Sequence, residues 1–416
     1  MKKNVLIIGA GGVAQVVAHK CAQNNDILGS LHIASRTRAK CEAIIASVRA
    51  KNSMKIAGEF AAHTLDAMNV AATTALIEKT GAQIIINVGS AFLNMSVLSA
   101  CINAKAAYID TAIHEDPLKI CETPPWYGNY EWRRRQECAQ AGISAVLGAG
   151  FDPGIVNAYA ALARDDYFAK MDSIDIIDIN AGNHKRWFAT NFDPEINFRE
   201  FTGQVYSWQK NAWQTNQMFE VKKEWDLPIV GKCATYMTGH DEIHSLSRTM
   251  AEHGNPDIRF WMSFGERYIT VFTVLKKLGL LSEQPVKTAE GQEVVPLKLV
   301  KAVLPDPAEL APEYTGKTCI GDWIKGTGKD GRPREIFLYN IADHEAAYTE
   351  TGAQSISYTA GVPATAAAIL IAQGDWDIKT MANIEELPPR PFLALNDKMG
   401  LPTWLQEDGK TQKLEF

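Results

Sequence analysis

The sequence predicts an α/β protein built on a doubly wound parallel sheet, with an α+β part inserted behind it. Three observations support this class. A glycine-rich turn joins a buried strand to a helix at the start of the chain. Strand and helix patterns then alternate, with short links, to about residue 150. After about residue 172 strands and helices no longer alternate strictly, and the 416 residues suffice for two domains.

Composition narrows the functional classes. Hydrophobic residues make up 46% and charged residues 22%, as in ordinary globular proteins. The net charge of −6 argues against non-specific binding of nucleic acid. No apolar run approaches the roughly 18 residues that a membrane span needs. The seven cysteines include no CxxC pair, so we expect reduced thiols. Together these observations predict a cytoplasmic protein that binds neither nucleic acid nor membrane.

The first strand and helix carry a nucleotide-binding fingerprint. KNVLIIG, residues 3–9, is typical of a buried parallel strand. It leads into a GxGxxA turn that opens a helix, which is the context that this fingerprint requires. The first glycine permits a tight turn, the second lets the backbone approach a pyrophosphate, and the helix N-terminus faces the phosphates. The stretch therefore predicts a Rossmann-type site that includes Gly9, Gly11, Gly12, Val13 and Ala14.

The end of the next strand, residues 30–35, indicates which nucleotide binds. In an NAD site an Asp or Glu stands about 20 residues past the fingerprint and holds the ribose 2′-hydroxyl. This chain has Ser-Arg-Thr-Arg at 35–38, with a lysine close behind and no carboxylate. Hydroxyl and guanidinium groups suit a 2′-phosphate. We therefore predict NADP as the cofactor, held through Ser35, Arg36, Thr37 and Lys40.

The following strands carry polar residues to one edge of the predicted sheet. Ligands of such folds lie beyond the carboxyl ends of the parallel strands. Residues 64–69, 82–90 and 107–112 each end or form a strand. We expect cofactor contacts from Asp66, Asn87, Val88, Gly89 and Thr111. Asp110 and His114 fall at the mouth of the site, the first as a catalytic group and the second as a substrate contact. The alternative is a capping Asp and a surface His.

The motif GAGFDPGI, residues 148–155, marks the junction between the two parts. It follows the strand predicted over 144–150, so we expect Gly150, Phe151 and Pro153 to contact the cofactor. A helix is predicted over 151–163. Asp152 suits its N-cap and the proline its first helical position. Asp152 is therefore predicted as a cap or as a substrate contact.

The second part has a different pattern. Residues 173–182 predict a strand with one solvated face, and 264–281 a long amphipathic helix. Residues 318–342 predict two strands joined through Asp330-Gly331, a strong hairpin signal. Strands and helices without strict alternation suggest an antiparallel sheet in an α+β domain.

The C-terminal stretch is predicted to return to the nucleotide domain. Residues 356–374 are rich in small residues and predict a helix, bent at its start by Gly361 and Pro363. The proline-rich stretch 388–406 predicts an extended tail. The predicted domains are thus 1–150 for nucleotide binding, 151–355 for substrate and dimerisation, and 356–416 for the return and the tail.

The stretch GHDEIHSL, residues 239–246, has two histidines four residues apart. On a helix they would share one face, as in the HExxH zinc signature. Here an aspartate stands where the general-base glutamate would be, and no third ligand follows at a recognisable spacing, so we predict no metal. The pKa of histidine suits proton transfer, so His240 and His244 are predicted catalytic residues. Asp241 and Glu242 are predicted substrate contacts, unless they serve only the helix dipole.

Several motifs together resemble the saccharopine dehydrogenase/reductase family. They cover essentially the whole chain, and they are GAGGVAQ, ASRTRAK, INVGSAFLN, YIDTA, GAGFDPGI and YTAGVPATAAA. GFDPGI followed much later by TAGVPA is far more specific than the nucleotide fingerprint alone. The resemblance implies a Rossmann sheet that is interrupted by a substrate and dimerisation domain. It also implies a homodimer.

The resemblance is greatest to the polyamine-forming branch of that family. It implies that L-aspartate 4-semialdehyde condenses with a diamine, 1,3-diaminopropane or putrescine, and that NADPH reduces the imine to carboxynorspermidine or carboxyspermidine. Such a site needs an acid and a base, anions for the ammonium groups, and a cation for the carboxylate. Asp241 and Glu242 would then meet the ammonium groups. Arg199 and Arg248 could hold the carboxylate, and Arg186, with His184 beside it, is favoured because it leaves a predicted strand end.

Three other functions stay open. A saccharopine-type or other opine-like dehydrogenase would use a different amino acid, which a substrate panel reveals. A catalytically silent NADPH-binding regulator would bind the cofactor tightly without turnover. A zinc hydrolase at the two histidines would show bound metal on analysis. The aromatic residues Trp187, Phe192 and Trp208 are expected to pack in the core rather than line a pocket.

Overall fold

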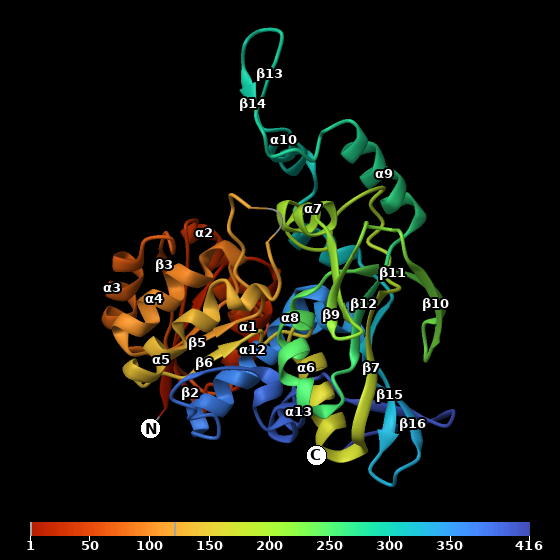
Figure 1. The fold of residues 1–416 in the computed structure, drawn as a ribbon. Helices are drawn as coiled ribbons and strands as arrows, with labels where there is room; N and C mark the ends of the chain where they lie inside the picture. Colours follow the sequence, from red (N-terminus) through yellow and green to blue (C-terminus); the bar gives the residue numbers. More distant parts are fainter. Residues whose placement is uncertain (1, 120–121) are drawn as a thin grey trace.

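The computed structural model describes residues 2–119 and 122–416. Within them the strands form a seven-stranded sheet, a ten-stranded sheet and a small two-stranded hairpin. Figure 1 shows the two larger sheets on opposite sides of the molecule, with helices between and around them. We call the seven-stranded sheet with its helices the first half, and the ten-stranded sheet with its helices the second half. The α/β class predicted from the sequence is confirmed.

Every strand pair of the first half is parallel, in the order β17-β6-β5-β4-β1-β2-β3. In β1, Val5 and Ile7 belong to one hydrophobic cluster, and Leu6 and Ile8 to another. Both faces of the sheet are therefore buried, which explains the continuous apolar runs in its strands. The predicted doubly wound sheet is confirmed. The strands are β1 (Lys3–Ile8), β2 (Leu28–Ser35), β3 (Phe60–Thr64), β4 (Ala82–Asn87), β5 (Ala107–Asp110), β6 (Ala145–Leu147) and β17 (Met381–Asn383).

Helices alternate with these strands, as the sequence predicts. Each connects one parallel strand to the next, so the carboxyl ends of the strands meet at one edge. α5 ends at a left-handed Gly142, where the pattern predicts the end of a helix. The helices are α1 (Gly12–Gln23), α2 (Arg38–Ala50), α3 (Val70–Thr80), α4 (Asn94–Ala104) and α5 (Arg135–Ala141).

The ten-stranded sheet of the second half is mixed, whereas the sequence suggested an antiparallel sheet. β7 pairs antiparallel with β15 on one side and parallel with β12 on the other. The hairpin predicted through Asp330-Gly331 is confirmed, because it joins β15 to β16. The strands are β7 (Phe168–Asn180), β8 (Val205–Gln209), β9 (Ala212–Asn216), β10 (Lys222–Leu227), β11 (Gly231–Thr238), β12 (Asp257–Ser263), β15 (Lys317–Gly328), β16 (Pro333–Asp343), β18 (Trp404–Glu407) and β19 (Lys410–Lys413).

One hydrophobic cluster runs through both halves. It contains Val5 of β1 and Ile174 of β7, and α6, whose eight residues are all buried, contributes to it between the sheets. The two halves therefore share a core rather than meeting at a solvated surface. The remaining helices are α6 (Ile155–Leu162), α7 (Pro194–Thr202), α8 (Asp241–Thr249), α9 (Glu266–Lys277), α10 (Pro296–Val303), α11 (His344–Thr351), α12 (Ser355–Gln373) and α13 (Pro389–Lys398).

The start of α6 differs from the prediction. Its N-cap is Gly154, with φ of 141°, so Asp152 is not the cap and Pro153 is not the first helical residue. Residues 150–154 form a tight turn instead, in which the Gly150 N–H donates to the Pro153 carbonyl over 2.8 Å. A Cβ on Gly154 would collide with the Gly150 backbone, so the turn requires a glycine there. The turn leaves the Asp152 carboxyl available for another role.

Helix α12 is continuous with Pro363 inside it, so Gly361 and Pro363 do not interrupt the helix, and the bend at these residues stays a prediction. A Cβ at Gly361 would lie 2.7 Å from the Cβ of Val16, and this glycine instead lets α12 approach α1 closely. By length and composition α12 could also span a membrane, contrary to the expectation of no such run, but 78% of its apolar window is buried within the protein. It is a core helix, shown beside α1 in Figure 1.

The C-terminal stretch is folded, so the predicted extended tail is wrong. β17 joins the first sheet, α13 follows, and the β18–β19 hairpin extends the second sheet beyond β16. The prolines at 388 and 389 stand at the start of α13, where proline is tolerated, rather than inside it. The exact domain boundaries stay predictions.

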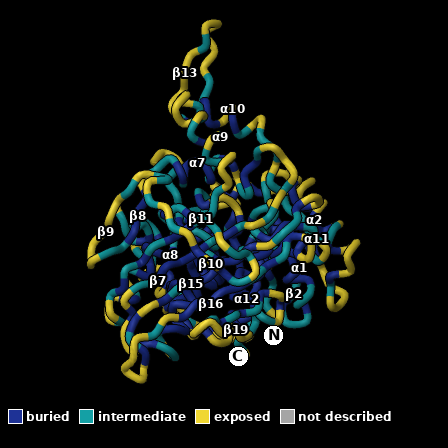
Figure 2. The backbone as a smooth tube through the Cα atoms, turned by 90° about the vertical axis from the view of Figure 1, so that its right-hand side faces the viewer, coloured by how far each residue is buried: buried dark blue, intermediate teal, exposed yellow. Residues whose placement is uncertain are grey.

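An arm projects from the second half (Figure 1). We define it as residues 266–303, which include α9, the hairpin β13 (Val286–Lys287) with β14 (Glu293–Val294), and α10. Figure 2 shows much of it as exposed backbone at one end of the molecule. Five of its apolar side chains are at least half exposed: Val274, Leu278, Val286, Leu299 and Val303.

Candidate active site

A cavity of about 650 Å³ lies between the two halves, at the carboxyl edge of the first sheet. Its lining comes from the turns after β1, β2, β4 and β5, and from α7, the start of α8 and β7 of the second half. A smaller cavity of about 410 Å³ adjoins it and shares Gly9, Ser35 and Gly89 with it. The site is therefore built by both halves together.

The turn after β1 has the geometry of a phosphate cradle. Gly9 has φ of 122°, and a Cβ there would lie 2.7 Å from the Val88 carbonyl oxygen, so only glycine fits. A Cβ on Gly11 would meet nothing within 4 Å, which leaves the backbone open to the cavity. α1 begins at Gly12 without a side-chain cap, so its first N–H groups are free to bind an anion.

The loop after β2 supplies cations and hydroxyls beside that cradle. Ser35, Arg36, Thr37 and Lys40 line the cavity. Ser35 accepts a hydrogen bond from the Thr37 N–H over 3.2 Å, which shapes the loop. Arg36 and Lys40 are exposed at the rim, and the residues of this loop fit the 2′-phosphate of NADP.

Most residues predicted to contact the cofactor lie on the cavity walls, and four do not. Ala14 and Phe151 are buried in the core, and Gly150 is engaged in the turn before α6. Asn87 is also buried, because its amide donates to Asn94 over 2.9 Å and thereby positions the β4 turn. Asp66 lines the smaller cavity. Those that line the larger one are Gly9, Gly11, Gly12, Val13, Ser35, Arg36, Thr37, Lys40, Val88, Gly89, Thr111 and Pro153.

His240 lines the cavity from the start of α8. It is the extended N-cap residue of that helix and precedes its first turn. Its ring stacks on Phe260 with centroids 4.1 Å apart, and its Nδ1 lies 2.7 Å from Glu242 Oε2. The Nε2 atom is 3.8 Å from Glu200 Oε1. The ring is thus held on one side by a carboxylate and has its other nitrogen directed toward a cavity residue.

The surroundings of His240 favour its protonated form. Burial alone would lower the pKa of the imidazole. The charge and hydrogen bond of Glu242, together with the charges of Glu200 and Asp152, outweigh burial and raise the pKa well above its ordinary value. His240 can therefore hold a proton at neutral pH and donate it into the cavity.

His244 does not share the position of His240, because His240 precedes α8, which begins at Asp241, and the two rings pack against different residues. The His244 ring lies between Trp126 and Trp213, with centroids 4.3 and 5.0 Å away. Its Nδ1 accepts the Trp126 N–H over 3.1 Å. Burial lowers the pKa of His244 to about 3. It is a neutral packing group outside the cavity lining, which contradicts the placement expected for a catalytic residue.

Two more predicted groups lie behind the cavity wall. Asp110 is buried and accepts the Gly148 N–H over 2.7 Å, and burial raises its pKa to about 7. It ties β5 to the β6 turn instead of reaching a substrate. Glu242 is fully buried and contacts His240 rather than the cavity, so its expected role as an ammonium partner does not fit.

Asp241, His114 and Asp152 do line the cavity, as predicted for substrate contacts. Asp241 Oδ2 accepts the Ile113 N–H of the first half over 2.6 Å. The His114 ring lies 3.1 Å from the Ala91 carbonyl oxygen and packs edge-on to Tyr130. The Asp241 contact therefore joins the two halves, whereas the His114 contacts lie within the first half.

Two further carboxylates complete an acidic wall that we define as Asp152, Asp178, Glu200 and Asp241. Asp178 Oδ1 and Glu200 Oε1 have no hydrogen-bond partner. Burial raises the pKa of Asp178 to about 6, of Glu200 to about 8 and of Asp241 to about 6, although the charge of His240 lowers each. Burial, followed by the charge of Asp178, also raises that of Asp152. Sequence reasoning missed Asp178 and Glu200, and the only signal was an acid within otherwise buried stretches.

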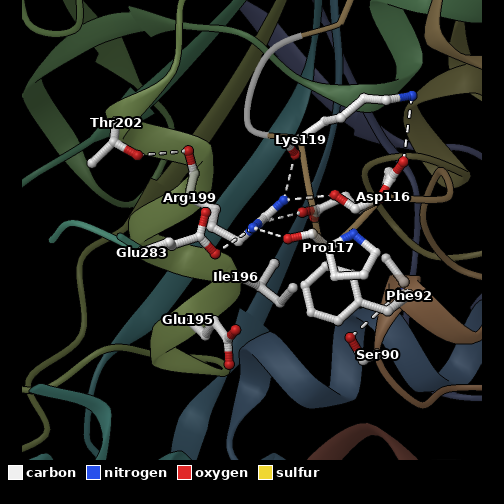
Figure 3. Close-up of polar contacts among 12 residues, drawn as sticks. Ser90, Phe92, Asp116, Pro117, Lys119, Glu195, Ile196, Arg199, Thr202 and Glu283 are labelled. Atoms are coloured by element: carbon white, nitrogen blue, oxygen red, sulfur yellow. Dashed lines mark hydrogen bonds and ion pairs between the residues drawn. The ribbon is translucent and has the colours of Figure 1, made fainter. Parts of the chain in front are cut away.

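None of the arginines considered for a carboxylate is free to bind one at the cavity. Arg186 is exposed and lies outside the lining, as does His184 near it. Arg248 stacks on Trp132, with its guanidinium 4.5 Å from the ring centroid. Arg199 reaches the cavity, but its guanidinium is bonded to Glu115, Glu283 and three carbonyl oxygens. Figure 3 shows this arrangement.

The three aromatic residues expected in the core lie in different surroundings. Trp187 is 69% exposed, which contradicts the expectation. Phe192 lines the cavity. Trp208 is partly buried and packs edge-on against Trp213, as expected.

The fold and the phosphate-binding edge define an NADP-dependent oxidoreductase. The profile of the saccharopine dehydrogenase NADP binding domain matches residues 5–146, and that of the saccharopine dehydrogenase C-terminal domain matches residues 150–401. The chain therefore belongs to the saccharopine dehydrogenase family, and NADP is its cofactor.

Relatives of this chain are similar over almost their whole length. A carboxynorspermidine synthase of Vibrio alginolyticus is 44% identical over 404 residues, which is 97% of each chain. A carboxyaminopropylagmatine dehydrogenase of Synechocystis is 39% identical over 96% of each chain. Among solved structures, apo saccharopine dehydrogenase (L-Glu forming) of Saccharomyces cerevisiae is 14% identical with a TM-score of 0.69, over 99% of this chain and 100% of that one. This last likeness shows the fold.

Proposed function

We propose that this chain catalyses the NADPH-dependent condensation of L-aspartate 4-semialdehyde with a diamine, 1,3-diaminopropane or putrescine, in polyamine biosynthesis. The product would be carboxynorspermidine or carboxyspermidine. The observation that carries the proposal is the acidic wall, which lines the same cavity as the nucleotide cradle and has two carboxylate oxygens without a hydrogen-bond partner. The carboxynorspermidine synthases of two Vibrio species, 44% and 43% identical, support the same reaction.

The chemistry begins with an amine attacking an aldehyde to form a carbinolamine. The carbinolamine loses water to give an imine, which needs one group to donate a proton to the departing hydroxyl and one to accept a proton from nitrogen. His240 is the proposed donor, since it is protonated and faces the cavity. Glu242 is proposed to orient the ring through Nδ1, in the way that a carboxylate fixes a catalytic histidine. Bound NADPH supplies the hydride that reduces the imine carbon.

The proposed acceptors are carboxylates of the acidic wall. Asp178 and Asp241, with pKa values of about 6, are ionised at neutral pH, and either can take the proton that an ammonium group must lose before its nitrogen attacks the aldehyde. Glu200, with a pKa of about 8, releases its proton more readily once a cation lies beside it. A diamine has a second ammonium group, and this wall would hold it by charge while the first one reacts.

The proposal is tested by following NADPH absorbance with the purified chain. We expect oxidation of NADPH only when aspartate semialdehyde and a diamine are both present. Agmatine is included as a further amine because of the relative named carboxyaminopropylagmatine dehydrogenase. NADPH consumption with glutamate and an aldehyde-bearing amino acid, but with no diamine, would instead establish a saccharopine-type enzyme. Absence of turnover with every pair would contradict the proposal.

We also propose that the chain is a cytoplasmic homodimer. The six cysteines within the described residues form no disulfide, which suits a reducing compartment. The exposed apolar side chains of the arm support a second copy as the occupant of that surface. They are Val274 of α9, Leu278 just after α9, and Leu299 and Val303 on one face of α10. Leu278→Asp with Val303→Asp should shift the mass measured by light scattering to that of a monomer. A wild-type monomer would contradict the dimer.

A further inference from the structure

Arg199 joins segments that lie far apart in the chain. It belongs to α7 of the second half and is 4% exposed. Its guanidinium donates to Glu115 Oε2 over 3.1 Å, to the Asp116 carbonyl over 2.9 Å and to the Pro117 carbonyl over 3.2 Å. It also bonds the Lys119 carbonyl and the side chain of Glu283, which lies in the arm between α9 and β13. Figure 3 shows the guanidinium with Asp116, Pro117 and Lys119 on one side and Glu283 on the other.

The segment that Arg199 holds forms one wall of the larger cavity. His114, Glu115, Asp116 and Lys119 all line that cavity. The same segment is fastened at its other end by Asp241, which accepts the Ile113 N–H. A segment of the first half is thus held at two points by side chains of the second half. Such contacts hold the segment in place more firmly than an ordinary surface loop is held.

Arg199 also supports the smaller cavity. Pro117, whose carbonyl it binds, and Phe92, whose ring centroid lies 5.2 Å from the guanidinium carbon, both line that cavity. Asp66 and Arg36 line it as well, and they follow β3 and β2. In nucleotide-binding folds this edge holds the adenosine part of the cofactor. A residue of the second half therefore shapes the wall against which the nucleotide would lie.

We propose that Arg199 is a positioning residue that couples NADPH binding in the first half to the packing of the second half. Its planar fork bonds five acceptors at once, which a lysine cannot reproduce. When the nucleotide packs against Pro117 and Phe92, it restricts the motion of these residues. The contacts of Arg199 then restrict the motion of α7 and Glu283 as well. The coupling is reciprocal, so loss of the guanidinium contacts lowers the affinity for NADPH.

The test uses Arg199→Lys in the full chain, with NADPH fluorescence for affinity and hydrogen–deuterium exchange for order. We expect the Kd for NADPH to rise about tenfold or more. We also expect NADPH to slow amide exchange in α9 of the wild type, because α9 leads to Glu283 although none of its residues lines either cavity. That protection should be lost in the variant while its far-ultraviolet circular dichroism stays native. The test needs no amine substrate, so it is independent of the proposed reaction.

Arg267→Lys is the matched control, because Arg267 lies on α9, is exposed and donates to the Trp187 carbonyl away from the cavities. It should bind NADPH as the wild type does. If Arg199→Lys does not fold, Glu283→Gln is used instead, because it removes one charged partner of Arg199. It should raise the Kd for NADPH about threefold and partly remove the protection of α9. Wild-type affinity or undiminished α9 protection in the folded variant would overturn the coupling role, as would wild-type behaviour of Glu283→Gln.

Discussion

Replacing Glu200 by glutamine should weaken diamine binding in a manner that depends on pH. Glu200 lines the cavity, and its Oε1 atom has no hydrogen-bond partner and lies 3.8 Å from His240 Nε2. Burial raises the pKa of Glu200 to about 8, so the free protein holds this carboxyl largely protonated at pH 6.5 and largely ionised at pH 8.5. Alkyl ammonium groups stay charged over this range. Glutamine, which is neutral, therefore resembles the protonated carboxyl and differs from the ionised one.

The magnitude follows from the kind of contact that is lost. A hydrogen bond to a charged group contributes about 1.5–3 kcal/mol. Glu200 keeps 22% of its side chain exposed, so solvent screening places the loss near the lower end of that range. We therefore expect Glu200→Gln to raise the Kd for putrescine roughly tenfold at pH 8.5, since about 1.4 kcal/mol is tenfold. At pH 6.5 the loss should be less than about twofold, because Glu200 is then largely protonated and neutral, as glutamine is.

Isothermal calorimetry with putrescine and NADP-loaded protein measures this directly. Calorimetry in buffers of different ionisation enthalpy should also detect protons released when putrescine binds the wild type near pH 7. Glu195→Gln is the matched control, since Glu195 lies on the same helix with 21% exposure but is paired with Lys301 instead of lining the cavity. An equal loss at both pH values, or no loss at pH 8.5, would refute the role of Glu200 in holding the amine.

Three further outcomes are expected. Arg36→Ala should raise the Kd for NADPH roughly tenfold or more and hardly change that for NADH, because a charge-assisted contact to the 2′-phosphate is lost. Fluorescence titration measures both constants, and equal effects on the two would exclude that contact. Glu242→Gln removes a charge that raises the pKa of His240, so the pH at which kcat/KM falls as His240 loses its proton should move lower, with NADPH affinity unchanged; an unmoved limb contradicts the pairing. Gly361→Ala should cost about 1–3 kcal/mol by overpacking against α1, seen as a lower Tm. Gly265→Ala, where a Cβ meets nothing within 4 Å, is its control.

The first half could be predicted from the sequence because its signals are local. Each strand is an apolar run, each turn carries glycine or polar residues, and the fingerprint at Gly9 fixes where the nucleotide edge begins. The C-terminal stretch failed because prolines at 388 and 389 were interpreted as breaking structure, whereas proline at the first turn of α13 is compatible with a helix. Pairing of β18 with β16 is a long-range contact that no local pattern encodes.

The active site was harder to predict, since it depends on where side chains point. A one-residue difference in the start of α8 decides that His240 faces the cavity and that His244 is packed between indole rings. Periodicity cannot locate a helix start that finely. Asp178 and Glu200 come from different elements and meet only in the folded chain. Arg199 looks like a substrate-binding residue in the sequence, but its donors are used by backbone carbonyls that only the fold brings to it.

The stack of Trp126, His244 and Trp213 is an intrinsic fluorescence probe of the distance between the two halves. Trp126 comes from the segment after β5, and Trp213 from β9 of the second half. The pKa of His244, lowered to about 3, keeps the ring between them neutral throughout the range in which an enzyme works. Indole emission from the stack therefore responds to ring separation and not to titration of the imidazole. A change in the spacing of these rings would therefore alter the tryptophan emission of the unlabelled protein, with Trp126→Phe and Trp213→Phe identifying the two contributions.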